Sequence, residues 1–211
     1  EKWGFINTEG KEITPLKYDD VASSLSEGFA WVKINGKYGF INTEGKEVIP
    51  LKYDHPTIRP LHFKFSEGLV AVMLNGKCGF INKEGEEVIP LKYVKAGSFS
   101  EGLAAVKLNG KWGFINKEGK EVIPLKYVSV SSFSDGLVVV NLNGKRGYIN
   151  QKGKEVTPLK YDLALPFLNG LGAVISNRKL GFVNQEGQEI TSLKYDFDFS
   201  TIPHFNGLVA V

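Results

Sequence analysis

Histidine side chains are the first candidates for catalysis or metal binding in this sequence. The three histidines are His55, His62 and His204, and none belongs to a spacing such as His-Glu-x-x-His. His55 and His62 share the longest segment between recurring motifs, where they could bind a metal or a substrate, although a loop histidine is more often only solvated. We therefore assign no metal ligand and no catalytic role to them.

Carboxylates are numerous but recur at fixed places. They fall in short glycine-containing turns and again three residues later, at Glu44, Glu84, Glu118 and Glu186 and then at Glu47, Glu87, Glu121 and Glu189. A glycosidase needs one pair of carboxyl groups in a cleft, in environments that separate their pKa values. Near-equivalent copies do not provide such a pair, so the sequence predicts a solvated face and a protein that is not an enzyme.

Composition narrows the remaining classes. The chain has 211 residues with 26 basic and 23 acidic side chains, a net charge of +3, which disfavours a disordered polyelectrolyte or a nucleic-acid binder. A single cysteine, Cys78, permits no intrachain disulfide, and no apolar run approaches the ~18 residues of a membrane span. We expect no cofactor. Because the chain begins Glu1-Lys2-Trp3, without a start methionine or signal peptide, we interpret it as a processed or excised piece.

The elements that position these residues are repeats. A motif Lys-x-Gly-(Phe/Tyr)-(Ile/Val)-Asn occurs six times, spaced by 35, 40, 34, 34 and 34 residues, beginning at Lys2, Lys37, Lys77, Lys111, Lys145 and Lys179. Each copy continues to a Leu-Lys-Tyr triplet and then to a small-polar-Gly step such as Ser100-Glu101-Gly102. We interpret residues 1–211 as one domain built from these six copies.

Turn chemistry predicts the structure of one copy. In the fourth copy, Asn109-Gly110 separates two strand-like runs, and Asn-Gly is the strongest local signal for a two-residue hairpin. Gly119 supplies a second reversal, and the third strand is expected over 121–123, stopping at Pro124, with a connection over 127–136. Arg178 replaces glycine in the last hairpin, where we expect strain or another turn type.

The hairpin register assigns side chains to faces. Pairing Leu108 with Lys111 places Trp112 and Phe114 on one face and Ile115 on the other. The Phe and Ile positions are nearly uniform among copies, which predicts a core. The position of Trp112 is variable, so we expect it at the periphery; its occupants are Trp3, Tyr38, Cys78, Trp112, Arg146 and Leu180.

Two further recurring residues have a structural and a functional interpretation. The asparagine that ends each motif is expected to accept hydrogen bonds from its own turn, in preference to binding calcium, because the loops lack the acidic alternation of calcium sites. The tyrosine of each Leu-Lys-Tyr triplet is expected to pack between copies, in preference to forming an aromatic ladder for sugars.

The sequence therefore predicts an all-β protein, a tandem array of six three-stranded antiparallel β-meander repeats. We expect an open superhelix or solenoid, with a closed six-bladed propeller-like ring as the alternative.

The motif Lys111-Trp112-Gly113-Phe114-Ile115-Asn116, with the later Glu-Val-Ile-Pro and the run from Phe99 to Val106, resembles the bacterial WG-repeat (KWG repeat) family over essentially the whole chain. The resemblance implies a bacterial repeat protein, extracellular or in the cell envelope, and it supplies no catalytic residues. The Asn-Gly-Lys-Trp hairpin is also similar to choline- and glucan-binding cell-wall repeats.

Three functions remain open. The first is a scaffold that binds an unidentified protein through an exposed row and the long connection, at Tyr38, Trp112, Arg146, Arg59 and His62. The second is a self-assembling structural protein, because the chain starts in a second strand and ends in a first strand. Its assembly edge would comprise Trp3, Phe5, Leu208, Val209 and Val211, which would close a ring, join chains head to tail, or fray. The third is binding of cell-wall carbohydrate.

Overall fold

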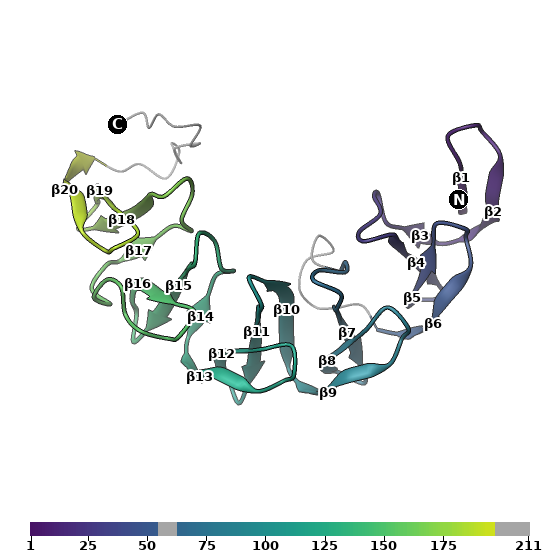
Figure 1. The fold of residues 1–211 in the computed structure, drawn as a ribbon, viewed down its shortest axis with the longest axis horizontal. Coiled ribbons are helices and arrows are strands. Elements are labelled where there is room, and N and C mark those ends of the chain that lie inside the picture. Colours follow the sequence, from purple (N-terminus) through teal and green to yellow (C-terminus); the bar gives the residue numbers. More distant parts are fainter. Residues whose placement is uncertain (55–62, 197–211) are drawn as a thin grey trace. The chain divides into compact units, whose positions relative to one another are not determined.

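The computed structural model describes residues 1–54 and 63–196, and within these ranges the chain consists of β-strands and turns without a helix. The strands form small antiparallel sheets joined in chain order (Figure 1). The chain divides into two compact units. The first comprises Glu1–Leu108 with Lys117–Gly119, and the second comprises Asn109–Asn116 with the residues from Lys120 onward.

The first unit holds eleven strands in the part of it that the structure describes. Their bounds are β1 (Trp3–Ile6), β2 (Glu12–Tyr18), β3 (Asp20–Val21), β4 (Phe29–Ile34), β5 (Lys37–Asn42), β6 (Glu47–Tyr53), β7 (Val70–Leu74), β8 (Lys77–Ile81), β9 (Glu87–Tyr93), β10 (Lys95–Ser100) and β11 (Leu103–Leu108). They form sheets in the orders β1-β2, β3-β4-β5-β6 and β7-β8-β9, and β10 pairs with β11.

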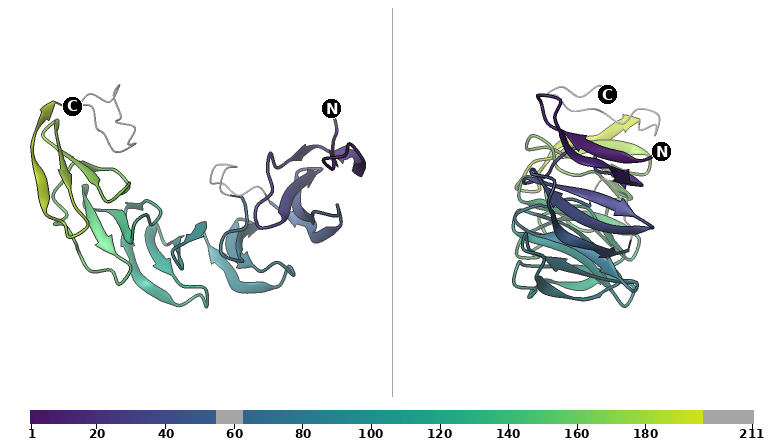
Figure 2. Two further views of the ribbon diagram at one scale, coloured as in Figure 1. Left: turned by 45° about the horizontal axis from the view of Figure 1, so that its top comes forward. Right: turned by 90° about the vertical axis from the view of Figure 1, so that its right-hand side faces the viewer.

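The second unit holds nine strands among its described residues. Their bounds are β12 (Lys111–Ile115), β13 (Glu121–Tyr127), β14 (Ser129–Val130), β15 (Leu137–Leu142), β16 (Lys145–Asn150), β17 (Leu163–Ala164), β18 (Gly172–Ser176), β19 (Lys179–Val183) and β20 (Glu189–Asp196). Here β12 pairs with β13, and the remaining sheets have the orders β14-β15-β16 and β17-β18-β19-β20 (Figure 2).

A fully paired copy has four strands, so the expectation of three was wrong by one. The additional strand comes from the connection: in the second copy, β3 pairs with β4 through Asp20 opposite Lys33 and Val21 opposite Val32. β17 pairs with β18 in the same way. β3 and β17 have two residues each, too few to leave an alternating pattern in the sequence, whereas β10 has six.

Two kinds of tight turn join these strands. The Asn-Gly turns have positive φ at both residues, as at Asn35 (50°) and Gly36 (77°). The acidic-Gly steps are turns of the same kind: Glu27 (φ 51°) and Gly28 (φ 88°) separate Ser26 from its bridge partner Phe29. Arg178 also adopts positive φ, 62°, so the last hairpin keeps the turn type and accepts a strained residue.

The third strand does not stop at its proline, contrary to expectation. β6 runs through Pro50, and Ile49 and Tyr53 pair with Phe40 and Tyr38, so three residues of β6 lie opposite the single Gly39. This bulge absorbs the proline, which has no amide hydrogen to donate. It also brings the backbone of the third strand so close to the motif glycine that a Cβ on Gly113 would lie 2.5 Å from the Ile123 carbonyl oxygen.

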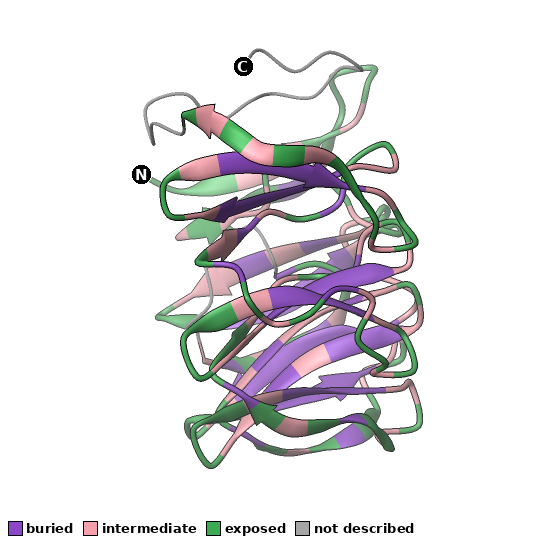
Figure 3. Cartoon of the chain, turned by 90° about the vertical axis from the view of Figure 1, so that its left-hand side faces the viewer, coloured by how far each residue is buried: buried purple, intermediate pink, exposed green. Residues whose placement is uncertain are grey.

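The core lies along the strands, and the turns are exposed (Figure 3). The expected register is confirmed in the second copy, where Ile34 pairs with Lys37 and Trp31 with Phe40. The Phe and Ile positions are buried, with Phe114 and Ile115 each 1% exposed. The motif aromatic stacks edge-to-face on a second aromatic from the following connection, at Phe80–Phe99, Phe114–Phe133 and Tyr148–Phe167, with centroids 4.7–5.0 Å apart.

Successive copies within each unit are linked by the acidic-Gly step. The Glu27 carboxylate accepts the Gly68 N–H at 3.0 Å and pairs with Lys83 Nζ at 3.0 Å, both in the next copy. Glu67 repeats the arrangement with Gly102 and Lys117, each at 3.1 Å. The serine before the carboxylate donates to a carbonyl of the next copy at 2.6–2.8 Å, in the pairs Ser26–Phe65, Ser66–Phe99 and Ser134–Phe167.

Candidate binding pocket

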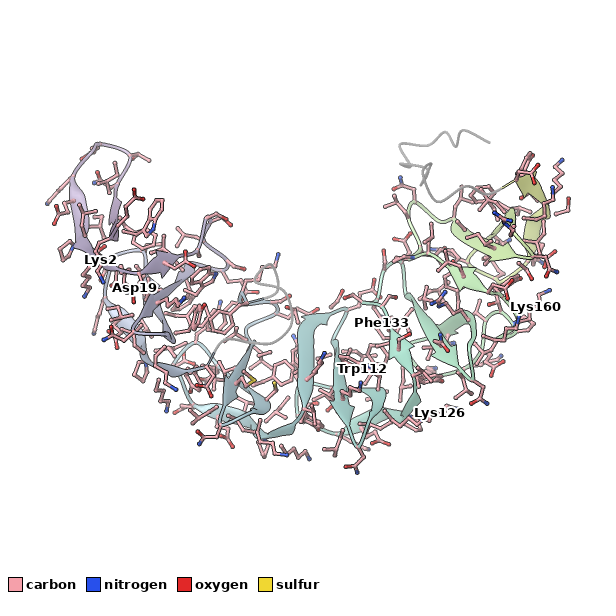
Figure 4. The ribbon with its side chains drawn as sticks, turned by 180° about the vertical axis from the view of Figure 1, so that it is seen from behind. Lys2, Asp19, Trp112, Lys126, Phe133 and Lys160 are labelled. Carbon is pink, nitrogen blue, oxygen red and sulfur yellow. The ribbon has the colours of Figure 1, made fainter. Side chains whose placement is uncertain are left out.

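The recurring polar residues serve the turns and strand ends. The asparagine of each motif accepts N–H hydrogen bonds from its own turn, as Asn42 Oδ1 does from Glu44 at 3.1 Å and Lys46 at 3.0 Å, which confirms the predicted role. In four copies the motif lysine pairs with the aspartate that follows the tyrosine, as Lys2 does with Asp19 at 2.5 Å (Figure 4). Hydrogen bonds from Lys2 and the Asn35 amide hold the pKa of Asp19 below its usual value of 3.8.

The tyrosines of the Leu-Lys-Tyr triplets are packed rather than available for ligands. Five are buried: Tyr18, Tyr53, Tyr93, Tyr127 and Tyr161. The lysine of each triplet lies 5.0–5.3 Å from its tyrosine ring centroid and covers that ring, as Lys52 covers Tyr53. These five rings are therefore part of the core, and no aromatic ladder of exposed rings is formed by them.

The predicted exposed row is not exposed throughout. Tyr38 is 5% exposed, so its place in an exposed row was wrong, and the variable position is also buried at Cys78 (5%) and Leu180 (3%). Tyr38 is covered because the connection that follows its sheet returns Phe63 against its ring, with centroids 5.6 Å apart. The variable position is therefore not peripheral in these copies. Whether it is exposed depends on whether the following connection places a side chain over it, as Phe63 does over Tyr38.

Trp112 and Arg146, in the second unit, are both half-buried. The Arg146 guanidinium donates to the Asp162 carbonyl at 2.7 Å, which fixes the direction of this side chain. Of the proposed assembly edge, Trp3 (50% exposed) and half-buried Phe5 lie on β1. Five other predicted site residues lie outside the described ranges: Arg59, His62, Leu208, Val209 and Val211.

The first unit contains a pocket that the sequence did not reveal. It has a volume of about 270 Å³. Aromatic rings form one wall, and a serine-rich segment forms the other, with the lining residues Ala22, Ser23, Ser24, Leu25, Ser26, Phe29, Trp31, Phe40, Phe63 and Lys64. The pocket thus lies beside the end of the long connection, where Phe63 and Lys64 follow the predicted Arg59 and His62.

The aromatic wall comes from residues specific to the second copy. Phe29 and Trp31 are two apart on β4, so both point to the same face. The first strands of the third to sixth copies carry Leu at the position of Phe29 and Ala or Val at that of Trp31. Both aromatics remain half-buried.

The rings of the wall contact one another. Phe29 lies 4.8 Å from Phe65, Phe40 lies 4.9 Å from Phe63, and Trp31 lies 5.6 Å from Tyr38, measured between centroids. These contacts hold the wall in place without a ligand.

The opposite wall is polar and carries one charge. Ser23 and Ser24 are exposed, and no hydrogen bond of their hydroxyl groups to another described residue is present. The Ser26 hydroxyl already donates a hydrogen bond to the Phe65 carbonyl. Lys64, which is exposed, is the only charged residue among the described residues of the lining.

The signal for this pocket was present in the sequence. Aligning the six first strands isolates Phe29 and Trp31 as the bulky exceptions, and the same alignment places Leu25 where later copies have Phe65, Phe99, Phe133 or Phe167. A pattern that records only whether a residue is apolar does not distinguish these two large side chains from the smaller ones in the other copies.

No group of three or more His, Cys, Asp or Glu side chains in the described ranges is arranged to hold a metal ion. The same part of the chain contains no helix long and apolar enough to cross a membrane.

Solved structures with a similar fold include β-propeller and other β-repeat proteins. Kluyveromyces lactis Hsv2 is 12% identical with a TM-score of 0.50, over 83% of this chain and 63% of that one. A eukaryotic initiation factor is 12% identical with a TM-score of 0.53, over 90% of this chain and 60% of that one. The chain thus spans less than two thirds of the length of either protein, and at these identities the likeness concerns the fold.

No curated protein matches the sequence. The family profile described as "WG containing repeat" matches five consecutive segments, at residues 3–38, 38–78, 79–112, 112–145 and 147–179. These segments cover most of the chain and coincide with the first five motif copies. The chain therefore belongs to the WG containing repeat family.

Proposed function

We propose that this chain is a non-enzymatic repeat scaffold for protein–protein interaction. Family membership and the fold likeness to β-propeller and β-repeat proteins support a scaffold. The bacterial origin and the extracellular or cell-envelope location implied by the resemblance belong to the same proposal, as does the arrangement of the copies in an open superhelix, with a closed ring as the alternative.

One observation carries the proposal: shared and copy-specific side chains have different uses. The residues common to the copies form turns, ion pairs and core contacts, as Asn42, Lys2 and Phe114 do. The copy-specific residues include half-buried Trp112 and Arg146. A repeat protein that varies such positions presents a different surface at each copy while keeping one fold.

Selection from a random peptide library tests the scaffold function. We expect peptides enriched on the native protein to lose at least about tenfold in affinity when Trp112→Ala or Arg146→Ala is introduced, which corresponds to about 1.4 kcal/mol. Lys120→Ala, an exposed turn residue, is the matched control and should leave binding unchanged. Failure to enrich any peptide, or binding insensitive to both variants, would reject this surface.

Self-assembly is the second candidate, and the exposure of β1 favours it. Within the described residues β1 pairs with β2, and Trp3 and Ile6 on it are 50% and 71% exposed. An exposed apolar strand edge can accept an added strand. Light scattering over a range of concentrations, with and without residues 208–211, separates the outcomes. Concentration-dependent oligomers that disappear on deletion support assembly, and a monomer with an unchanged melting temperature rules it out.

A further inference from the structure

The aromatic pocket of the second copy has a lining that matches a ligand with one flat apolar face and a polar edge. We propose that it binds one ring of an acidic saccharide, a pyranose that carries a carboxylate. The ring stacks on Trp31 and Phe29, the serine segment binds its hydroxyls, and Lys64 pairs with its carboxylate. This site is independent of the scaffold surface at Trp112 and Arg146.

The aromatic wall supplies the stacking surface. Phe29 and Trp31 project from one face of β4, and their half-buried state leaves ring surface open to the pocket. The carbon–hydrogen bonds on one face of a pyranose are apolar enough to pack against such rings, and contact removes both apolar surfaces from water.

The serine segment supplies the polar edge. Each hydroxyl both donates and accepts a hydrogen bond, which is the pairing that sugar hydroxyls need. Ser23 and Ser24 are exposed at the pocket, and no hydrogen bond from either hydroxyl to a described residue is present, so both can turn towards a ligand.

Part of the backbone around the pocket is already hydrogen-bonded, which disfavours addition of a peptide strand along β4. Peptides that add to a sheet are held by main-chain hydrogen bonds. Here the Ala22 amide donates to the Trp31 carbonyl at 2.9 Å, and Ser26 and Phe29 exchange both of their backbone bonds at 2.8 and 3.0 Å. With these groups paired, we expect recognition at this wall through side chains, and the polar and aromatic side chains of the described lining are aromatic rings, hydroxyls and one ammonium.

Charge and size define the ligand further. Lys64 is exposed, and the described lining residues include no carboxylate, so this part of the pocket favours an anionic group over a cationic one. The volume of about 270 Å³ is at the lower end of small-molecule sites, which matches one ring of a longer chain better than a whole oligosaccharide.

The matched variant follows from the other copies. Phe29→Leu combined with Trp31→Ala gives this strand the residues that the third, fourth and sixth copies already carry at these positions, so the fold should persist. Circular dichroism and the melting temperature check this. Trp112→Ala, in the second unit, is the control for loss of a tryptophan elsewhere.

Calorimetric titration with trigalacturonic acid tests the proposal. We expect binding to the native protein that weakens at least about tenfold in the Phe29→Leu/Trp31→Ala variant and is unchanged in Trp112→Ala. Lys64→Gln should weaken trigalacturonic acid while leaving neutral maltotriose unaffected, and the affinity for the acidic sugar should fall as salt is added.

Three results would overturn the proposal. The first is that neither saccharide binds up to about 10 mM, and the second is that saccharide binding is unchanged in the Phe29→Leu/Trp31→Ala variant. The third is that the acidic tryptophan peptide acetyl-Glu-Trp-Glu-amide binds and the sugars do not. The pocket variants do not alter Trp112 or Arg146. A negative saccharide titration would therefore leave the scaffold function open, and a negative peptide selection would leave saccharide binding open.

Discussion

At the scale of single residues, the residues that recur in each copy do so because the local backbone geometry requires them. The motif glycine is required because three residues of the neighbouring strand bulge over it, which no side chain could accommodate. In three copies a threonine replaces the isoleucine beside this bulge, and its hydroxyl accepts the amide of the motif aromatic, as Thr14 does from Phe5 at 2.9 Å and Thr157 from Tyr148 at 3.0 Å. A substitution at the glycine or at the threonine therefore changes a backbone contact or a backbone hydrogen bond directly.

The first prediction concerns this glycine. Gly113→Ala should lower the free energy of unfolding by about 1–3 kcal/mol, because the new methyl group would lie 2.5 Å from the Ile123 carbonyl oxygen and must displace it. Gly97→Ala is the control, since its nearest neighbour would be 3.7 Å away. Urea unfolding measures both. Equal losses at the two sites would contradict the role given to the bulge.

The second prediction ranks side chains of the fourth copy. Phe114→Ala and Ile115→Ala should each cost about 2–5 kcal/mol of stability, because both side chains are 1% exposed and leave cavities. Trp112→Ala should cost less, because Trp112 is half-buried. The same urea assay applies. If Trp112→Ala proved the most damaging of the three, the assignment of faces would be wrong.

At the scale of elements, the acidic-Gly turn both closes a hairpin and links two copies. Glu27 occupies the positive-φ position of its turn while its carboxylate holds the Gly68 amide and Lys83 of the next copy. Partial burial opposes ionisation of Glu27, but the hydrogen bonds from Lys83 and Gly68 outweigh it and hold its pKa below the usual 4.5.

The third prediction tests this link through pH. A carboxylate whose pKa is lowered on folding contributes stability above its unfolded pKa, and this contribution is lost as the pH falls through the folded value. Glu27→Gln should therefore cost about 0.5–1 kcal/mol at pH 7, the range of exposed ion pairs, and less at pH 3. Urea unfolding at both pH values measures the difference, with exposed Glu44→Gln as the control. A loss of equal size at both pH values would contradict the link.

Prediction from sequence worked where the chemistry was local. Asn-Gly pairs fixed the hairpins and their register, and uniform Phe and Ile positions identified the core, because each rule depends on a few neighbouring residues. The Glu-Gly turns carry a similar signature and were still missed. The strand through Pro124 depends on backbone bulging, and the burial of Tyr38 depends on Phe63 from the following connection, and no short pattern encodes either of them.

At the scale of the whole molecule, stability should be distributed along the chain by neighbouring copies. The links identified here join one copy to the next, through Glu27 to Gly68 and Asp135 to Gly170 for example. Repeat proteins of this kind behave as sums of copy stabilities and nearest-neighbour terms.

The fourth prediction follows from this arrangement. Phe182→Ala removes a 5% exposed ring from the sixth copy and should cost that copy about 3–5 kcal/mol. Hydrogen exchange followed by mass spectrometry should show lost protection in β17–β20, a smaller loss in β14–β16 and none in β3–β6. A loss of protection spread evenly over all strands would show instead that the molecule unfolds as one unit.

The carboxylate link also bears on how such a gene can change. Because Glu27 and Glu67 reach only the copy that follows each of them, and use the same glycine amide and turn lysine there, a duplicated or deleted copy meets complementary partners at both of its ends. Unequal recombination in register with the motif would then yield a longer or shorter protein that keeps this link wherever the joined copies carry the acid, the glycine and the turn lysine. The number of copies can therefore change during evolution. The binding residues of one copy can be lost or duplicated while the fold stays the same.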